Sequence, residues 1–175
     1  MLVTPATAMR TEKLAVAVCS TPYIVQLAYV QRCAAAGAWL AIAPADVPTL
    51  DADDFAGASV DFAAVLRARG PLPLRPLAGC YFAFASQFSN NAALSDRVLR
   101  LIKTGGGSVE LSLTLEFASL HKDSLIVLAS KDDTLDRASK GLAAMGVLYH
   151  YQLVLTALVR NRVTPADLKH YRIVA

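Results

Sequence analysis

The residues whose types best suit binding or catalysis form one short polar cluster, MRTEK at residues 9–13, directly before the apolar run LAVAV. Arg10, Thr11 and Lys13 bring two cations and a hydroxyl group to what we expect to be the first turn of a helix. A helix N-terminus presents unpaired N–H groups and a partial positive charge, and it therefore attracts anions. Because acidic residues are favoured there, a basic pair indicates either an anion-binding site or an ordinary, solvated helix start.

No other group of residues indicates catalysis or metal binding. His121, His150 and His170 are scattered, and no serine lies in a nucleophile-elbow or triad context. The glycines of TGGG (104–107) follow an expected helix instead of preceding one, so they predict a C-cap and turn, not a phosphate loop. We therefore expect a protein that is not an enzyme and that holds neither a cofactor nor a metal ion.

Composition limits the class of protein. The chain has 175 residues, of which 55% are apolar and 18% charged, so it is long enough for one large domain or two small ones and is far from a disordered composition. No apolar run approaches the roughly 18–20 residues of a membrane span, and the start lacks the pattern of a signal peptide. Cys19, Cys33 and Cys80 are odd in number and widely spaced, which argues against a disulfide framework and predicts a reduced, intracellular protein. A net charge of +3 is too weak to indicate nucleic-acid binding by itself.

The elements that must position the polar cluster fall into two blocks joined by a proline-rich middle. The first block contains a helix over residues 10–20, a short strand at 22–26 and a helix over 27–37 that Gly37 ends as a C-cap. The middle is predicted to consist of a loop at 44–57, a lone amphipathic helix over 59–69 and an irregular segment at 70–79.

The second block is more complete, and its strands are rich in buried-type residues. The predicted order is a strand at 80–86, a helix within 94–107 that the three glycines end, strands at 108–113 and 124–130, a helix over 133–146, a strand at 147–151 and a helix over 152–163. This order predicts an α/β fold with a mainly parallel sheet that helices cover on both faces.

Several segments resemble the BRCT family. LIKTGGGSV (101–109) is similar to the first helix, glycine turn and second strand of a BRCT domain. The segment from residue 2 to residue 33 resembles the third strand, second helix, fourth strand and third helix, and Tyr29 and Cys33 match the aromatic-x-x-x-Cys pattern of that last helix. Residues 54–86 resemble the linker helix and re-entry strand of tandem BRCT pairs.

The resemblance implies a tandem BRCT pair, in which each repeat is a four-stranded parallel sheet flanked by helices, the first repeat is truncated and a helical linker joins the two. The predicted divisions are 1–43 for the later half of the first repeat, 44–78 for the linker and 79–175 for the second repeat. The second helix of the first repeat is expected to pack against the first and third helices of the second.

In phosphopeptide-binding pairs the second helix of the first repeat begins with Arg-Thr-x-Lys, and residues 10–13 match this pattern. The resemblance implies that Lys13 binds the phosphate of a phosphoserine or phosphothreonine. By the same resemblance, Thr11 is expected to help orient the site, and Arg10 is expected to reach the peptide backbone or terminus near position +3. A phosphate brings about two negative charges and strong acceptors, which a lysine and helix N–H groups satisfy.

The second repeat offers secondary contacts only. Ser89, Asn90 and Asn91 lie where the second repeat is expected to face the first, so they either touch the peptide or simply cap a helix. Ser86 follows the first strand of this repeat, but Gln87 replaces the glycine of the family's phosphate-binding Ser/Thr-Gly pair. The second repeat is therefore not expected to bind phosphate.

Two departures affect the first repeat. Ala15 stands where several members of the family place a large aromatic residue beside the +3 pocket, so a different preference at that position would follow. The Ser/Thr-Gly pair that should lie some 30 residues before Arg10 is absent from the sequence. Either the chain is a fragment, or its first repeat is degenerate, or Thr4 serves as that ligand on a shortened strand.

The expected partner is a phosphorylated protein or peptide, with neither a membrane nor a metal involved. With its composition heavy in Ala, Leu, Val and Arg, the pair resembles most the C-terminal BRCT pair of a kinetoplastid kinetochore protein. This resemblance implies a nuclear role in chromosome segregation. The alternatives are a DNA-damage-response protein, or a scaffold or DNA-binding pair without phosphate recognition. A basic face for DNA would come from Arg67, Arg69, Arg75, Arg97 and Arg100.

Overall fold

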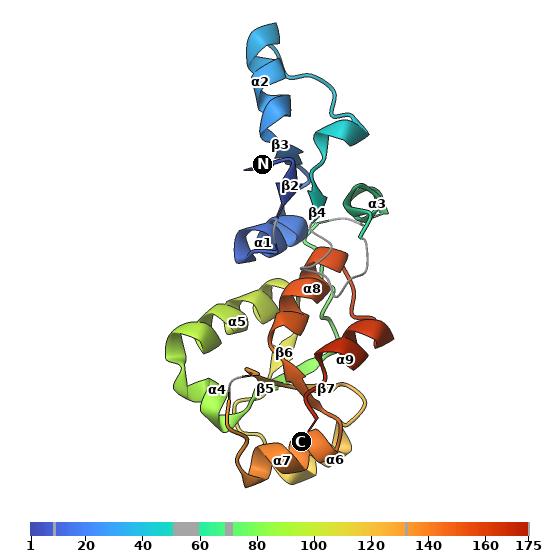
Figure 1. The fold of residues 1–175 in the computed structure, drawn as a ribbon. Helices are drawn as coiled ribbons and strands as arrows, with labels where there is room; N and C mark the ends of the chain where they lie inside the picture. Colours follow the sequence, from blue (N-terminus) through green and yellow to red (C-terminus); the bar gives the residue numbers. More distant parts are fainter. Residues whose placement is uncertain (9, 51–59, 69–71, 132, 175) are drawn as a thin grey trace.

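The computed structural model describes residues 1–8, 10–50, 60–68, 72–131 and 133–174. Within them the strands pair in parallel, and helices flank the sheets. Figure 1 shows an elongated molecule, with the N-terminal elements at one end and the sheet of the second half at the other. We call residues 1–43 the first repeat and residues 79–175 the second repeat, and these boundaries stay predictions.

The first repeat alternates strands and helices as expected. Apart from the two-residue strand β2 (Thr7–Ala8), its elements are β1 (Leu2–Thr4), α1 (Glu12–Ser20), β3 (Ile24–Gln26) and α2 (Leu27–Ala36). The two strands run parallel, with Leu2 opposite Ile24. Helix α2 ends at Gly37, whose φ of 64° lies in the left-handed region that glycine adopts without steric cost. The predicted strand–helix–strand–helix order is confirmed.

The linker contains more regular structure than expected. Its described elements are a 3-10 helix (Pro44–Asp46), β4 (Thr49–Leu50) and α3 (Phe62–Ala68), and β4 pairs with β2 (Thr7–Ala8). The prediction of a loop over 44–57 is therefore wrong for its first part, and residues 51–57 lie outside the described residues. A two-residue strand has no sequence pattern of its own, because only its distant partner defines it. The amphipathic helix is confirmed over Phe62–Ala68, whereas residues 60 and 61, which were also predicted to be helical, precede it.

The second repeat is built on a four-stranded parallel sheet in the order β6-β5-β7-β8. Its strands are β5 (Tyr81–Phe84), β6 (Ser108–Val109), β7 (Leu125–Ala129) and β8 (Leu148–His150). Its helices are α4 (Ser86–Asn90), α5 (Ala92–Thr104), α6 (Leu115–Leu120), α7 (Arg137–Ala144), α8 (Gln152–Arg160) and α9 (Pro165–Tyr171). Every residue of β7 is buried, as its unbroken apolar run predicts. The predicted four-stranded parallel sheet is confirmed.

Further differences from the sequence expectations concern one helix start, one strand end and three additional helices. Helix α1 begins at Glu12 instead of residue 10, so Arg10 precedes it. Strand β6 ends at Val109, so the strand predicted over 108–113 is too long. Helices α4, α6 and α9 were not predicted, because each is only one or two turns long. For α9 a local pattern was present: Thr164 and Asp167 form a capping box, with Pro165 in the first turn.

The two repeats share a hydrophobic core, beside which Val25, Tyr29 and Cys33 form a smaller buried cluster within the first repeat. Helix α1 packs against α8 and α5, which lie beside it in Figure 1. Leu14 and Val18 of α1 belong to the same buried cluster as Leu158 of α8. Arg97 of α5 adds an ion pair to Glu12 at the start of α1. The predicted packing of the second helix of the first repeat against the first and third helices of the second is confirmed.

Candidate functional site

The predicted phosphate site lies at the N-terminus of α1. Thr11 is the N-cap residue, and its Oγ1 accepts a hydrogen bond from the backbone N–H of Leu14 at 3.2 Å. Helix geometry gives the N–H groups of the first turn no intrahelical acceptor, and Thr11 satisfies one of them. Thr11 and Lys13 are both exposed on this turn. A cation, a hydroxyl group and a helix N-terminus therefore meet at an open surface, which suits an anion.

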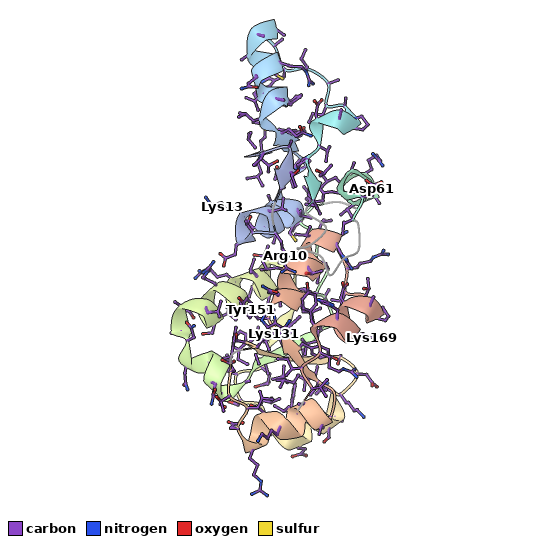
Figure 2. All side chains as sticks on the ribbon, viewed as in Figure 1. Arg10, Lys13, Asp61, Lys131, Tyr151 and Lys169 are labelled. Carbon is purple, nitrogen blue, oxygen red and sulfur yellow. The ribbon has the colours of Figure 1, made fainter. Side chains whose placement is uncertain are left out.

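Lys13 borders an open hollow between α1 and β1 of about 370 Å³. Figure 2 shows Lys13 on the outer side of α1, away from the second repeat. Thr4, the alternative phosphate ligand, lies in β1, and its hydroxyl donates to the carbonyl of Pro5 at 2.9 Å. The other lining residues of the hollow are Met1, Leu2, Glu12, Val16, Ala17 and Thr21.

Arg10 points toward the second repeat instead (Figure 2). Its Nη1 donates to Oγ1 of Thr156 in α8 at 2.9 Å and to Oη of Tyr171 in α9. The guanidinium also lies 5.9 Å from the centroid of the Tyr171 ring. The structure thus places Arg10 at the boundary between the repeats, while its role in peptide binding stays a prediction.

The predicted secondary contacts lie apart from this cluster. Ser89 and Asn90 belong to α4, and the Ser89 hydroxyl donates to the carbonyl of Ala85. Asn91 is the N-cap of α5, and its side-chain oxygen accepts from the N–H of Leu94 at 3.2 Å. Asn91 precedes Arg97, a residue of α5 that contacts α1, by six positions, or about 9 Å along the helix. The capping role is thereby observed for Asn91, and peptide contact by the three residues stays a prediction.

In the second repeat, the exposed carboxylate of Asp136 lies beside Ser86, the first residue of α4. The hydroxyl of Ser86 donates to Oδ2 of Asp136 at 2.5 Å, and the N–H of Ser139 donates to Oδ1 at 2.7 Å. Asp136 is the N-cap of α7 and lines a hollow of about 350 Å³ together with Ser86. The Ser86 hydroxyl and the start of α7 are therefore already bonded to an anion, and a phosphate there would meet like charge. This geometry supports the expectation that the second repeat does not bind phosphate.

Asp136 should make the stability of the fold sensitive to acid. Hydrogen bonds from Ser86 and Ser139 lower the pKa of its carboxyl from 3.8 to about 2. A carboxyl whose pKa is lower in the folded state stabilises the fold above its unfolded pKa, and this contribution is lost as the pH falls through the folded value. We expect Asp136→Asn, which retains an N-cap residue, to lower the melting temperature at neutral pH. The difference from the native protein should shrink between about pH 5 and about pH 2.

The measurement is thermal unfolding followed by circular dichroism across that pH range. Asp123→Asn is the matched control, because Asp123 is exposed and precedes β7 outside any cap. A difference between native protein and Asp136→Asn that stays constant down to about pH 2 would contradict the prediction.

A second, apolar hollow lies in the first repeat. It measures about 640 Å³, and its lining residues are Met1, Tyr23, Tyr29, Trp39, Leu40 and Ile42. Trp39 is 72% exposed and Tyr23 53% exposed, which is unusual for large apolar side chains. Exposed apolar patches occur at protein- and membrane-interaction sites and in ligand-binding grooves.

The described residues contain no group of three or more His, Cys, Asp or Glu side chains arranged to hold a metal ion. Likewise, no helix within the described ranges is long and apolar enough to cross a membrane. The three cysteines are free thiols, and burial raises the pKa of the Cys19 thiol to about 11. Cys19 is therefore protonated at neutral pH and is a poor nucleophile.

Sequence reasoning missed the residues that hold Arg10. Thr156 reads as one polar position within an apolar helix, and Tyr171 lies in a helix that was not predicted. They are 146 and 161 residues away from Arg10 along the chain. A buried threonine on an otherwise apolar helix is the one pattern that indicates an unidentified hydrogen-bond partner.

Neither protein-family models nor curated proteins contain a match to this sequence. Among solved structures, the chain is similar to the crystal structure of the BRCT5–BRCT6 domains of Brc1 from S. pombe, with a TM-score of 0.56. The similarity covers 90% of this chain and 79% of the Brc1 chain at 15% sequence identity. The chain therefore has the fold of a tandem BRCT pair, as the resemblance of its segments predicted.

Proposed function

We propose that this chain is a non-enzymatic protein-interaction module that binds phosphoserine or phosphothreonine peptides. The observation that carries the proposal is the placement of Lys13, an exposed cation on the first turn of α1 beside the N-cap Thr11. The phosphate accepts hydrogen bonds from Lys13 and from N–H groups of the helix start, and the helix dipole adds to the attraction. Arg10 contacts the peptide farther along, at the boundary between the repeats.

The apolar hollow at Trp39 favours a second candidate, a scaffold that binds protein without phosphate. It also favours protein over DNA as the partner, because nucleic-acid interfaces are strongly basic. Arg97, one of the candidate DNA-binding arginines, is paired with Glu12.

We propose a nuclear setting for this module, in a kinetochore protein that acts in chromosome segregation. The support is the alanine-, leucine-, valine- and arginine-rich composition together with the tandem BRCT fold. A DNA-damage-response protein is the alternative setting.

Peptide binding measured by fluorescence anisotropy separates these candidates. The probe is a degenerate peptide library with a fixed phosphoserine, compared with its unphosphorylated twin and with a duplex DNA. We expect the phosphorylated library to bind about 10- to 100-fold more tightly, as one charge-assisted contact predicts. Equal binding of both libraries would favour the scaffold, and strongly salt-dependent binding of any duplex would favour DNA.

A further inference from the structure

Arg10 is joined to two hydroxyl groups of the second repeat, and the three groups form a closed triangle. Nη1 of Arg10 lies 2.9 Å from Oγ1 of Thr156 and 2.5 Å from Oη of Tyr171. The two hydroxyl oxygens lie 2.8 Å apart and share a hydrogen bond. Because an arginine can only donate, both oxygens accept from Nη1, and one hydroxyl donates to the other.

This triangle fixes the plane of the guanidinium. Thr156 is fully buried and Tyr171 is 4% exposed, so neither hydroxyl can exchange its partner readily for water. A guanidinium is planar and rigid, and anchoring one of its nitrogens at two points therefore orients the others. The guanidinium carbon of Arg10 lies 5.9 Å from the centroid of the Tyr171 ring, and the ring limits movement of the guanidinium toward that side.

Tyr171 is itself held firmly by the second repeat. Its helix α9 begins at the capping box of Thr164 and Asp167, and Arg160 of α8 donates to the buried Asp167 at 2.5 Å. After α9, the N–H of Ile173 donates to the carbonyl of Leu148 in β8 at 2.9 Å. The position of Arg10 is thus set by the sheet of the second repeat through α9.

We propose that Tyr171, together with Thr156, is a positioning residue for the contact that Arg10 makes with the peptide. The inference rests on the proposed function, because it concerns the same binding site. Through Tyr171, helix α9 takes part in recognising peptide residues beyond the phosphate. The phosphate contact of Lys13 is independent of α9. Specificity for those residues is therefore a property of both repeats together.

The test compares two forms of the degenerate phosphoserine library, one ending just after the phosphoserine and one continuing past the +3 position, called here the short and the long peptide. Tyr171→Phe removes only the hydroxyl and retains the ring. The measured quantity is the ratio of the affinity for the long peptide to the affinity for the short one. We expect this ratio to fall about three- to tenfold in Tyr171→Phe, the effect of one lost hydrogen bond. The affinity of the short peptide should not change.

Tyr149→Phe is the matched control, because Tyr149 is also buried in the second repeat and its hydroxyl donates to the carbonyl of Gly146 at 2.9 Å. It should leave the ratio of the two affinities unchanged. Arg10→Lys keeps the charge but loses the planar fork, so it should reduce the ratio, and adding Tyr171→Phe should reduce it little further.

An unchanged ratio in Tyr171→Phe, or an equal change in Tyr149→Phe, overturns the positioning role and leaves the proposed function standing. The same holds if the native protein binds both peptides equally. If the native protein binds neither peptide, the proposed function itself fails, and the inference fails with it.

Discussion

Lys13→Glu should reduce phosphopeptide affinity at least about 100-fold, because it removes a charge-assisted contact and adds repulsion between a carboxylate and the phosphate. Folding should be unaffected. Lys13 is exposed, and a second glutamate beside Glu12 suits the positive end of the helix dipole. Isothermal titration calorimetry measures the affinity, and thermal unfolding verifies the fold.

Lys140→Glu is the matched control for this experiment. It changes the net charge by the same amount at an exposed position of α7, which Figure 1 places at the far end of the molecule from α1. Phosphopeptide affinity should stay within about twofold of native in this control. A folded Lys13→Glu protein with native affinity would show that residues 10–13 are an ordinary helix start.

Thr11→Ala provides a graded comparison at the same site. Loss of a neutral hydroxyl should weaken binding by about 0.5–1.5 kcal/mol, well below the effect at Lys13. From the sequence alone, Thr11 is a surface position where substitution changes stability little. Because the structure makes Thr11 the N-cap of α1, we now expect Thr11→Ala to lower the free energy of unfolding by about 0.5–2 kcal/mol as well.

Leu158→Ala should have the largest effect on stability, a loss of about 2–5 kcal/mol in the free energy of unfolding. Leu158 of α8 is fully buried in the core that both repeats share. A Cβ atom added at Gly105 would lie 2.6 Å from Cδ2 of Leu158, so the leucine packs directly on the glycine that follows α5. Truncation leaves a cavity that neighbouring side chains refill only in part.

The expected fall in melting temperature is roughly 4–20 °C, at about 2–4 °C per kcal/mol for a chain of this size. Leu111→Ala is the control, since Leu111 is 83% exposed and its truncation should change the free energy of unfolding by less than about 0.5 kcal/mol. If both variants unfold at the native temperature, Leu158 does not contribute to a continuous core.

Local patterns were sufficient to predict most of the fold. The unbroken apolar run at β7 identified a strand buried on both faces, and Gly37 marked the end of α2. The TGGG turn after α5 was likewise placed correctly as the end of a helix. Such features depend on residues within one or two turns of each other, so the sequence carries them directly. Very short elements such as α4 and β4 were not predicted, because too few residues define them.

The candidate site shows where local patterns stop being informative. The sequence alone determined that Arg10, Thr11 and Lys13 stand together at a helix start, and that a tandem BRCT fold surrounds them. Only the tertiary structure decided that Lys13 faces outward while Arg10 is bound to Thr156 and Tyr171. Lys13 lies on the first turn of α1 and Arg10 precedes the N-cap Thr11, but what each side chain meets depends on how α8 and α9 pack. That packing results from burial of apolar surface between segments more than a hundred residues apart, which no local pattern encodes.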